Sequence, residues 1–305
     1  MSPPDLASAA GPDDGAALDP LAILAALGVQ APRAVLHVPG GSDTAVWKIG
    51  TSQGWRALRV FRPDEDERCR RECAALRLAQ ENGLPVPAVR RQGFWRRRPV
   101  MLLDWLPGNS LSQATLRHPA RAWRWGVEFG QTQASMHAIT ASAPELAVGG
   151  WLADAEAAVN SGLRAQLDHV EGPAALLHLD YHASNTLVAG QRVSGVIDWA
   201  NSGRGDPRYD LARTELIFRM NVQLNESLGL RSRICQRALH RGWRLASGFA
   251  AGAPSTMRIF LTWAGVATLR DLAPKLGQPG CTWRRHHLDR LSAWVERWQD
   301  DILAC

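Results

Sequence analysis

The sequence predicts an α+β protein with a small, strand-rich N-terminal lobe and a larger, mostly helical C-terminal lobe. Five short strand-like runs lie between residues 34 and 105, with one helical pattern among them. From residue 119 onward the apolar spacing is mainly helical, and a hairpin pattern rich in polar residues interrupts it. We therefore expect a disordered leader at 1–20, one lobe at 21–107 and another at 108–305.

Composition limits the class of protein. The chain of 305 residues is long enough for one large or two modest domains. No apolar run reaches the roughly 18–20 residues that span a bilayer, and the N-terminus lacks the basic start and apolar core of a secretory signal. We expect a cytoplasmic protein that binds neither membrane nor nucleic acid. Five cysteines, with Cys69 and Cys73 four residues apart and no zinc-like spacing, predict reduced thiols.

The N-terminal lobe opens with a helical pattern at 18–29. Three strand-like runs follow it, at 34–38, 44–49 and 55–61. Gly40 and Gly41 lie between the first two runs, where glycine would let backbone amides approach a phosphate closely. An ordinary hairpin turn is the alternative for this segment.

Arg59 lies within the third strand, and Glu72 lies near the middle of the helix expected from residue 63 to Gly83. A strand base paired with a helix carboxylate can hold the phosphates of a nucleotide, and the arginine fork can bind two phosphate oxygens. A surface ion pair is the alternative.

Two further strands are expected at 88–95 and 99–105, and the segment 103–108 then breaks the pattern. This segment would be the junction between the lobes. An adenine ring bound there would contact backbone groups, so we assign Asp104 and Leu106 to the nucleotide site.

The helical lobe begins with helices expected at 119–139 and 152–167. In the first, Gly126, Gly130 and Ala134 predict close packing against a neighbouring helix. Asp206 followed by Pro207 is typical of a helix start, so Asp206 and Asp210 are expected to be structural. The later helices are expected at 207–223, 232–249, 255–275 and 284–303.

Tryptophans recur through those later helices, at positions 243, 263, 283, 294 and 298. They predict a tryptophan-rich core, with an aromatic cage for a quaternary amine as the alternative.

One stretch carries the chemistry. His178-x-Asp180 is followed by Asn185, a strand at 186–188, a turn at Gly190 and a strand at 193–197 that leads to Asp198. A hairpin returns its ends to one place, so Asn185 and Asp198 should lie close together. A carboxylate to orient a hydroxyl, with an amide and a second carboxylate to hold Mg²⁺, is the set that phosphoryl transfer from ATP or GTP needs. A solvated loop before an ordinary hairpin is the alternative.

These motifs resemble those of the aminoglycoside phosphotransferase and choline kinase family, which has a protein-kinase-like fold. HLDYHASN at 178–185 resembles the family's HGDLHPGN, with Leu179 in place of glycine. VIDW at 196–199, GDPRYDLA at 205–212, LRVF at 58–61 and RECAAL at 71–76 also have family counterparts. The resemblance implies that Asp180 is the catalytic base, that Asn185 and Asp198 bind Mg²⁺, and that Arg59 and Glu72 form the phosphate clamp. His178 and His182 would shape the loop.

The predicted function is an ATP- and Mg²⁺-dependent kinase that phosphorylates a hydroxyl of a small molecule. A nucleotide-binding module without activity is the alternative, because Leu179 and the glycine loop depart from the family pattern. A kinase acting on polypeptides is disfavoured, because the segment from Asp198 to Asp206 is too short for an activation loop.

Charge bears on the acceptor. Residues 211–305 hold 14 Lys or Arg and 7 Asp or Glu, a net charge of +7, although the whole chain carries only +6. This makes a neutral or anionic acceptor at least as plausible as a polycationic aminoglycoside. Glu215 and Glu226 could still form a local acidic patch. The sequence does not determine the oligomeric state.

Overall fold

A computed structural model describes most of the chain. It covers residues 18–29, 32–39, 44–146, 152–153, 155, 159–170, 172–224, 229–251, 254–277 and 284–303. Most of the expected leader, the glycine loop at 40–43, Trp283 and Glu226 lie outside these residues. Among the helices of the described segments, none has the length and apolar character that crossing a membrane requires.

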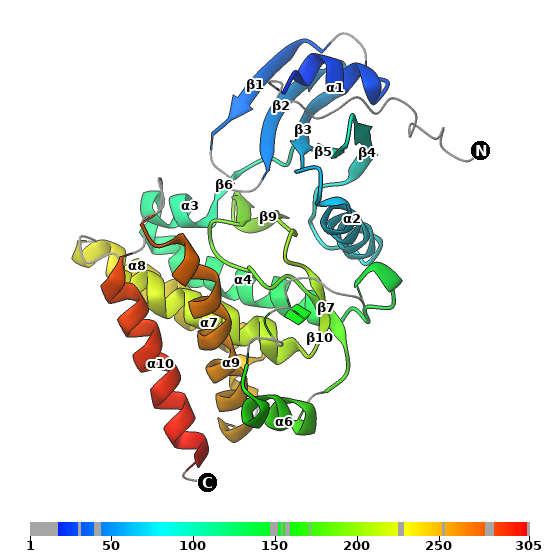
Figure 1. Ribbon diagram of the computed structural model, residues 1–305. Coiled ribbons are helices and arrows are strands. Elements are labelled where there is room, and N and C mark those ends of the chain that lie inside the picture. The colour runs from blue at the N-terminus through cyan, green and yellow to red at the C-terminus, as the bar shows by residue number, and fades with distance from the viewer. Residues whose placement is uncertain are drawn as a thin grey trace.

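The N-terminal lobe is an antiparallel sheet of five strands in the order β1-β2-β3-β5-β4 (Figure 1). The strands are β1 (Ala34–Val38), β2 (Ala45–Thr51), β3 (Gly54–Val60), β4 (Val89–Trp95) and β5 (Arg98–Asp104). The five expected strands are therefore confirmed, with ends displaced by a few residues.

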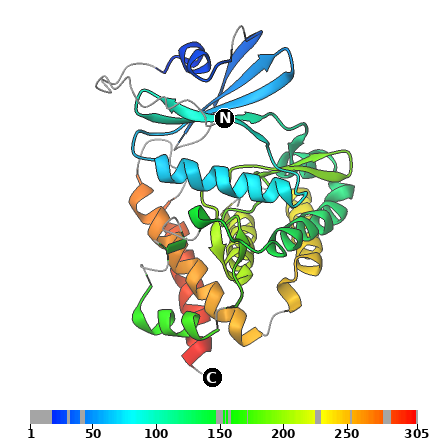
Figure 2. The ribbon, with the colours of Figure 1, turned by 90° about the vertical axis from the view of Figure 1, so that its right-hand side faces the viewer.

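A helix covers each face of this sheet. Alternation along β5 sends Val100 and Leu102 into the cluster that contains the short helix α1 (Pro20–Ala26). Met101 and Leu103 belong instead to the main core with α2 (Asp66–Glu81). Figure 2 shows α2 crossing beneath the sheet, between it and the helices of the other lobe. Both faces of the sheet are thus buried, and α2 lies at the junction of the lobes.

Helices dominate the C-terminal lobe. They are α3 (Leu111–Arg117), α4 (Ala122–His137), α6 (Ser161–Val170), α7 (Pro207–Leu224), α8 (Leu230–Ala246), α9 (Pro254–Leu272) and α10 (Arg285–Leu303). Short 3-10 turns are η1 (Pro119–Arg121), η2 (Pro144–Leu146), η3 (Phe249–Ala251) and η4 (Ala273–Lys275). The remaining strands are β6 (Asn109–Ser110), β7 (Ala175–Leu177), β8 (Thr186–Ala189), β9 (Arg192–Val196) and β10 (Gly203–Gly205). β6 pairs with β8, which places the chain just beyond residue 108 against the second lobe. The domain boundary at 107–108 stays a proposal.

One expected helix is wrong in its extent. The pattern at 152–167 does not form a single helix, because residues 159–160 are not helical and α6 begins only at Ser161. The side chain of Asn160 accepts a hydrogen bond from the backbone N–H of Leu163 at 2.8 Å. Such a bond is typical of a helix cap, so Asn160 starts a new helix there.

The expected close packing of the first long helix is confirmed. α4 and α8 meet backbone to backbone, because a Cβ atom on Gly126 would overlap the carbonyl oxygen of Leu239. Gly130 and Gly242 are restricted in the same way by backbone atoms of the opposite helix. Replacing any of them would force the two helices apart.

We expect Gly126→Ala to lower the free energy of unfolding by about 1–3 kcal/mol, since the obstacle is rigid backbone. Urea denaturation followed by circular dichroism measures this change. Gly162→Ala in α6 is the matched control, because its Cβ would make only an ordinary contact of 3.5 Å with Asn160. Equal stability of the two variants would contradict the packing argument.

Two buried cysteines of α2, Cys69 and Cys73, are free thiols, as expected. The thiol of Cys73 lies 3.3 Å from the sulfur of Met101. They therefore belong to the packing of α2 against the sheet.

Candidate active site

The hairpin β8–β9 forms as predicted, with Gly190 at a positive φ of 63° in its turn. At its open end, the backbone N–H of Ile197 donates to the carbonyl oxygen of Asn185 at 2.9 Å. Asp198 follows Ile197 directly. The structure therefore brings Asn185 and Asp198 together, as the hairpin pattern predicted.

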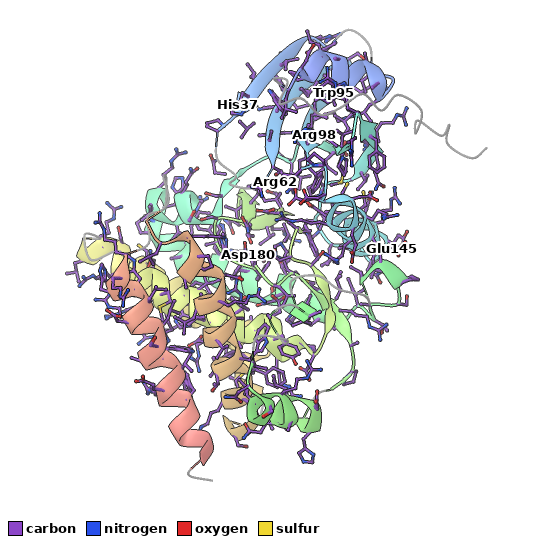
Figure 3. The ribbon with its side chains drawn as sticks, in the orientation of Figure 1. His37, Arg62, Trp95, Arg98, Glu145 and Asp180 are labelled. Atoms are coloured by element: carbon purple, nitrogen blue, oxygen red, sulfur yellow. The ribbon has the colours of Figure 1, made fainter. Side chains whose placement is uncertain are left out.

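Asp180 lies between the two lobes, near the middle of the molecule (Figure 3). The side-chain amide of Asn185 donates to its backbone oxygen at 3.1 Å and to its carboxylate Oδ2 at 3.2 Å. His182 Nε2 lies 3.6 Å from Oδ2, and Arg213 Nη2 lies 3.9 Å from Oδ1. Burial alone would raise the pKa of Asp180, but His182 and Arg213 together hold it well below its usual value. Asp180 is therefore ionised at any physiological pH.

Asp210, at the start of α7, holds the loop that carries Asp180. Its carboxylate is fully buried and accepts the backbone N–H groups of His178 at 3.3 Å and Leu179 at 2.9 Å. It also bonds His137 Nε2 at 3.0 Å. Burial alone would raise the pKa of Asp210, but the contacts with His137 and His178 together leave the pKa below its usual value. The expected structural role of Asp210 thus consists in anchoring this loop.

His178 is also part of the loop framework. Its ring is fully buried, its Nε2 lies 3.0 Å from the carbonyl oxygen of Ile197, and its Nδ1 accepts the backbone N–H of Asp180 at 3.3 Å. Burial lowers the pKa of His178, so the ring is neutral. The ring therefore links the loop of Asp180 to the strand end that carries Asp198.

Leu179 has a left-handed backbone with φ of 60°, the region that favours glycine. Its side chain is nevertheless fully buried in the main core. Leu179 therefore holds a conformation that glycine would adopt without strain, and packing of the leucine offsets the strain.

Arg59 of β3 and Glu72 of α2 form a buried ion pair. The other guanidinium nitrogen of Arg59 lies 3.3 Å from Thr44 Oγ1 and 3.4 Å from Asp198 Oδ1. Burial raises the pKa of Glu72 to about 7, although Arg59 opposes the shift. Arg59 therefore connects the sheet, α2 and the end of the hairpin, and the alternative of a surface ion pair is wrong.

A cleft of about 310 Å³ lies between the sheet and the hairpin. Arg59, Glu72, Asn185 and Asp198 line its polar side. Its apolar lining includes Val38, Ala57, Leu103, Leu106, Leu187 and Ile197. Shape and lining suit a nucleotide with its base between apolar side chains and its phosphates toward Arg59.

Asp104 and Leu106, which the sequence analysis assigned to the nucleotide site, both line this cleft. The Asp104 carboxylate is already held by Arg90 at 2.6 and 2.8 Å and by Arg56 at 3.2 Å. Any contact of Asp104 with a base would therefore come from its backbone. Gly40 and Gly41 lie outside the described residues.

A second cleft of about 410 Å³ adjoins the first. It is lined by Asp180, His182 and Arg213, and Asp198 lines both clefts. Asp180 therefore lines a second cleft, distinct from the one that suits a nucleotide, where another molecule could bind.

Arg213 is the residue of this site that the sequence analysis missed. It is buried, donates from Nε to the carbonyl oxygen of Leu179 at 3.2 Å and from Nη1 to Thr268 at 2.5 Å. Burial lowers the pKa of Arg213. A signal was present, because Arg213 lies three residues after Asp210 and so on the same face of a helix.

The chain is similar to known proteins both in sequence and in structure. A family model described as "Phosphotransferase enzyme family" matches residues 34–249. No curated protein matches the chain. Among solved structures, the chain is similar to a thermostable mutant of aminoglycoside phosphotransferase APH(4)-Ia in ternary complex with AMP-PNP and hygromycin B, at 16% identity and TM-score 0.60 over 93% of this chain and 96% of that one.

Two further structures have the same fold. Macrolide 2'-phosphotransferase MphH from Brachybacterium faecium is 19% identical with TM-score 0.53, over 90% of this chain and 96% of that one. Aminoglycoside phosphotransferase APH(3'')-Id from Streptomyces rimosus is also 19% identical with TM-score 0.53, over 77% and 92% of the two chains. The bilobal, kinase-like fold expected from the sequence is confirmed, and the chain belongs to the phosphotransferase enzyme family.

Proposed function

We propose that the protein transfers the γ-phosphoryl group of ATP, bound with Mg²⁺, to a hydroxyl group of a small molecule. The observation that carries this proposal is the position of Asp198, which lines both clefts, with Arg59 on one side and Asp180 on the other. In-line transfer needs a phosphate site and an acceptor site that meet at the reacting atoms. The relatives crystallised with AMP-PNP and ADP support ATP as the donor.

The residues present fit Mg²⁺. Because the Asn185 amide nitrogen donates to Asp180, its Oδ1 is left as the acceptor atom, beside the half-exposed carboxylate of Asp198. Two hard oxygen ligands with room for water and phosphate oxygens are what Mg²⁺ prefers. When bound, the ion would neutralise charge on the phosphates.

Asp180 would orient the acceptor hydroxyl by accepting its hydrogen bond. Its lowered pKa makes it a weak base, so the proton would move to it late, when the bond to phosphorus is largely formed. Arg213 and His182 keep the carboxylate ionised, and Asn185 fixes its direction. Leu179 does not favour the alternative of a nucleotide-binding module without activity, since its backbone has the left-handed conformation that glycine readily adopts.

We propose a neutral or anionic acceptor. The acceptor would bind in the second cleft, which contains Asp180. Among its described lining residues, the carboxylates are Asp180, Asp198 and Asp271, and Asp271 is bonded to Arg270 at 2.7 Å. Arg68, Arg213 and Lys275 balance them. The first two carboxylates are assigned to the hydroxyl and to Mg²⁺. No surplus acidic group among these residues would attract a polycation.

ADP release with ATP and Mg²⁺ across a panel of hydroxylated acceptors tests the proposal. The panel pairs neutral, anionic and polycationic acceptors of similar size. We expect stimulation by a neutral or anionic acceptor, and none by any acceptor in Asp180→Ala. Stimulation by polycations alone would overturn the acceptor class, and ATP binding without stimulation by any acceptor would overturn the transferase proposal.

The buried pair gives the clamp a pH dependence. Glu72 is ionised above its pKa of about 7 and protonated below it, where Arg59 loses its anionic partner. We expect ATP affinity to fall as pH is lowered from about 8 to about 6. Calorimetric titration at each pH measures this.

The matched control is Glu72→Gln, which should bind ATP more weakly at pH 8 and change less with pH. Protonation of the phosphate itself affects both proteins equally and cancels in the comparison. The same pH dependence in both proteins would contradict the assignment to Glu72.

A further inference from the structure

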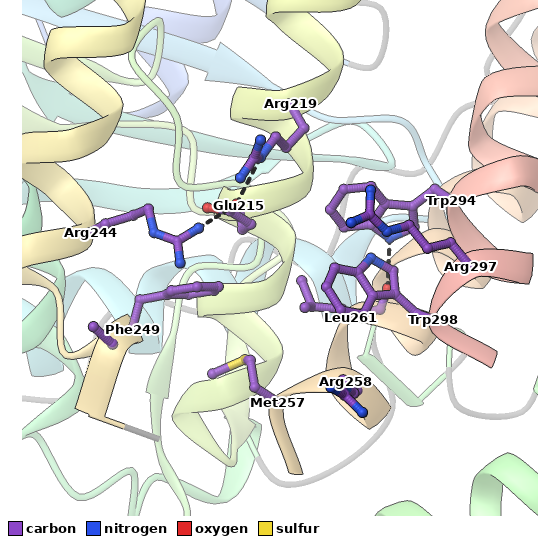
Figure 4. Close-up of a pocket in the computed structure, with 11 residues that line it drawn as sticks. Glu215, Arg219, Arg244, Phe249, Met257, Arg258, Leu261, Trp294, Arg297 and Trp298 are labelled. Carbon is purple, nitrogen blue, oxygen red and sulfur yellow. Dashed lines mark hydrogen bonds and ion pairs between the residues drawn. The ribbon is translucent and has the colours of Figure 1, made fainter. Parts of the chain in front are cut away.

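A third cleft, of about 540 Å³, lies among α7, α8, α9 and α10 (Figure 4). It is larger than either cleft of the active site and shares no lining residue with them. Helices α7 and α9 also contribute to the cleft that contains Asp180, but with different residues. Nothing in the proposed transfer reaction uses it.

One wall of the cleft is apolar and aromatic. Phe249, Met257 and Leu261 are buried, and Trp294 and Trp298 are partly exposed. The Trp294 ring is held in place, because its Nε1 donates to the carbonyl oxygen of Leu261 at 2.9 Å. Trp294 and Trp298 meet edge to face at 5.7 Å. The wall is therefore preformed.

A glycine lets α10 approach α9 at this wall. A Cβ atom on Gly265 would lie 2.6 Å from Val295 Cγ2 and 2.9 Å from Trp294 Cδ1. Both distances are shorter than real Cβ contacts. The position of Trp294 therefore depends on this close approach of the two helices, and the wall is part of the folded core.

The charge of the cleft is strongly positive. Arg219, Arg244, Arg258 and Arg297 line it, and Glu215 is the one carboxylate among the described lining residues. Figure 4 shows Glu215 between Arg219 and Arg244, each 2.9 Å from Oε1.

His240 completes the compensation of Glu215, at 2.6 Å from Oε2. Burial would raise the pKa of Glu215, but the bond to His240 and the arginines lower it, so the group stays ionised. Its charge is therefore already compensated. Glu215 therefore adds no uncompensated negative charge to the acidic patch considered for Glu215 and Glu226, and Glu226 lies outside the described residues.

The arginines keep donors for a ligand. A guanidinium has five N–H groups, and Arg219 and Arg244 each use one nitrogen on Glu215. Arg244 and Arg297 also lie over aromatic rings, at 4.5 Å from Phe249 and 5.4 Å from Trp298. Positive groups therefore stand beside the apolar wall. A quaternary amine would be repelled here, which excludes the aromatic-cage alternative at Trp294 and Trp298.

From this charge and shape, we propose that the cleft is a second ligand site that binds an amphipathic organic anion, with a flat apolar body against Trp294 and Trp298 and one acidic group toward the arginines. The ligand class follows from the tryptophan wall and from the excess of arginines over carboxylates among the described lining residues. The site does not depend on the proposed function.

Three probes of one shape test the ligand class: 1-naphthoate, neutral 1-naphthylmethanol and cationic 1-naphthylmethylamine, each titrated calorimetrically into the full chain. We expect naphthoate to bind at least about tenfold more tightly than the alcohol, since charge-assisted hydrogen bonds contribute on this scale, and the amine to bind least. Equal binding of all three would overturn the role of the arginines.

Arg297→Gln tests the position, because this arginine is exposed and the fold does not rest on it. We expect naphthoate affinity to fall about tenfold and alcohol affinity to stay unchanged. Arg285→Gln removes the same charge from an exposed position of α10 outside the cleft and should have no effect. An equal loss of naphthoate affinity in both variants would show that only the net charge of the protein matters, and would overturn the proposed site.

Indole N–H resonances locate the probe independently. Trp294 and Trp298, assigned through Trp→Phe variants, should shift on addition of naphthoate, and excess ATP should not reverse the shift. Shifts confined to other tryptophans, such as Trp105 in the nucleotide cleft, would place the probe elsewhere and overturn the proposal.

Discussion

Asp180→Ala is expected to lower the turnover number by about 10²–10⁴-fold, the range that a positioned acid–base group contributes. The lost carboxylate is the group placed to orient the acceptor hydroxyl. Nucleotide affinity should change little, since Asp180 does not line the nucleotide cleft. Acceptor-dependent ADP release gives the turnover, and calorimetric titration with AMP-PNP gives the affinity.

Asp168→Ala is the matched control, because Asp168 is an exposed carboxylate of α6 with 53% side-chain exposure. It should turn over like the unmodified protein. A loss of AMP-PNP affinity in Asp180→Ala as large as the loss of turnover would contradict the role of Asp180, since the residue would then support the nucleotide site itself.

Asp198→Asn is expected to remove most of the Mg²⁺-dependent part of nucleotide affinity, and turnover with it. The change removes the charged ligand without straining the backbone, because Asp198 has a φ of 63° and asparagine tolerates this conformation well. Asp198→Ala would add backbone strain to the loss of the ligand. We expect at least about a tenfold loss, on the scale of one charged contact.

Titration of ATP with Mg²⁺ and with EDTA separates the metal-dependent part. The unmodified protein should bind far more tightly with Mg²⁺, and Asp198→Asn should show nearly equal affinity in both buffers. An unchanged ratio of the two affinities in the variant would show that Asp198 is not a metal ligand. Loss of affinity in EDTA as well would point to the contact between Asp198 and Arg59 at 3.4 Å.

The predictions that held depend on residues close together in the chain. The short apolar run at 100–103 is typical of a strand buried on both faces, and the turn at Gly190 brings Asn185 to Asp198 over thirteen positions. The predicted ends of the helices were less accurate. The apolar spacing at 152–167 did not reveal the capping bond of Asn160, which starts a new helix at Ser161.

By itself, the sequence determined the two lobes, the hairpin that carries Asn185 and Asp198, and the strand and helix that carry Arg59 and Glu72, because short-range periodicity and turn chemistry depend on neighbouring residues. Tertiary structure alone decided how charges are compensated. Arg213 approaches Asp180 from α7, Arg90 and Arg56 contact the Asp104 carboxylate, and His240 and Arg244 of α8 contact Glu215 of α7. Most of these pairings join side chains far apart in the chain, and burial then fixes their protonation, so a local pattern can mark a candidate such as Arg213 without revealing its partner.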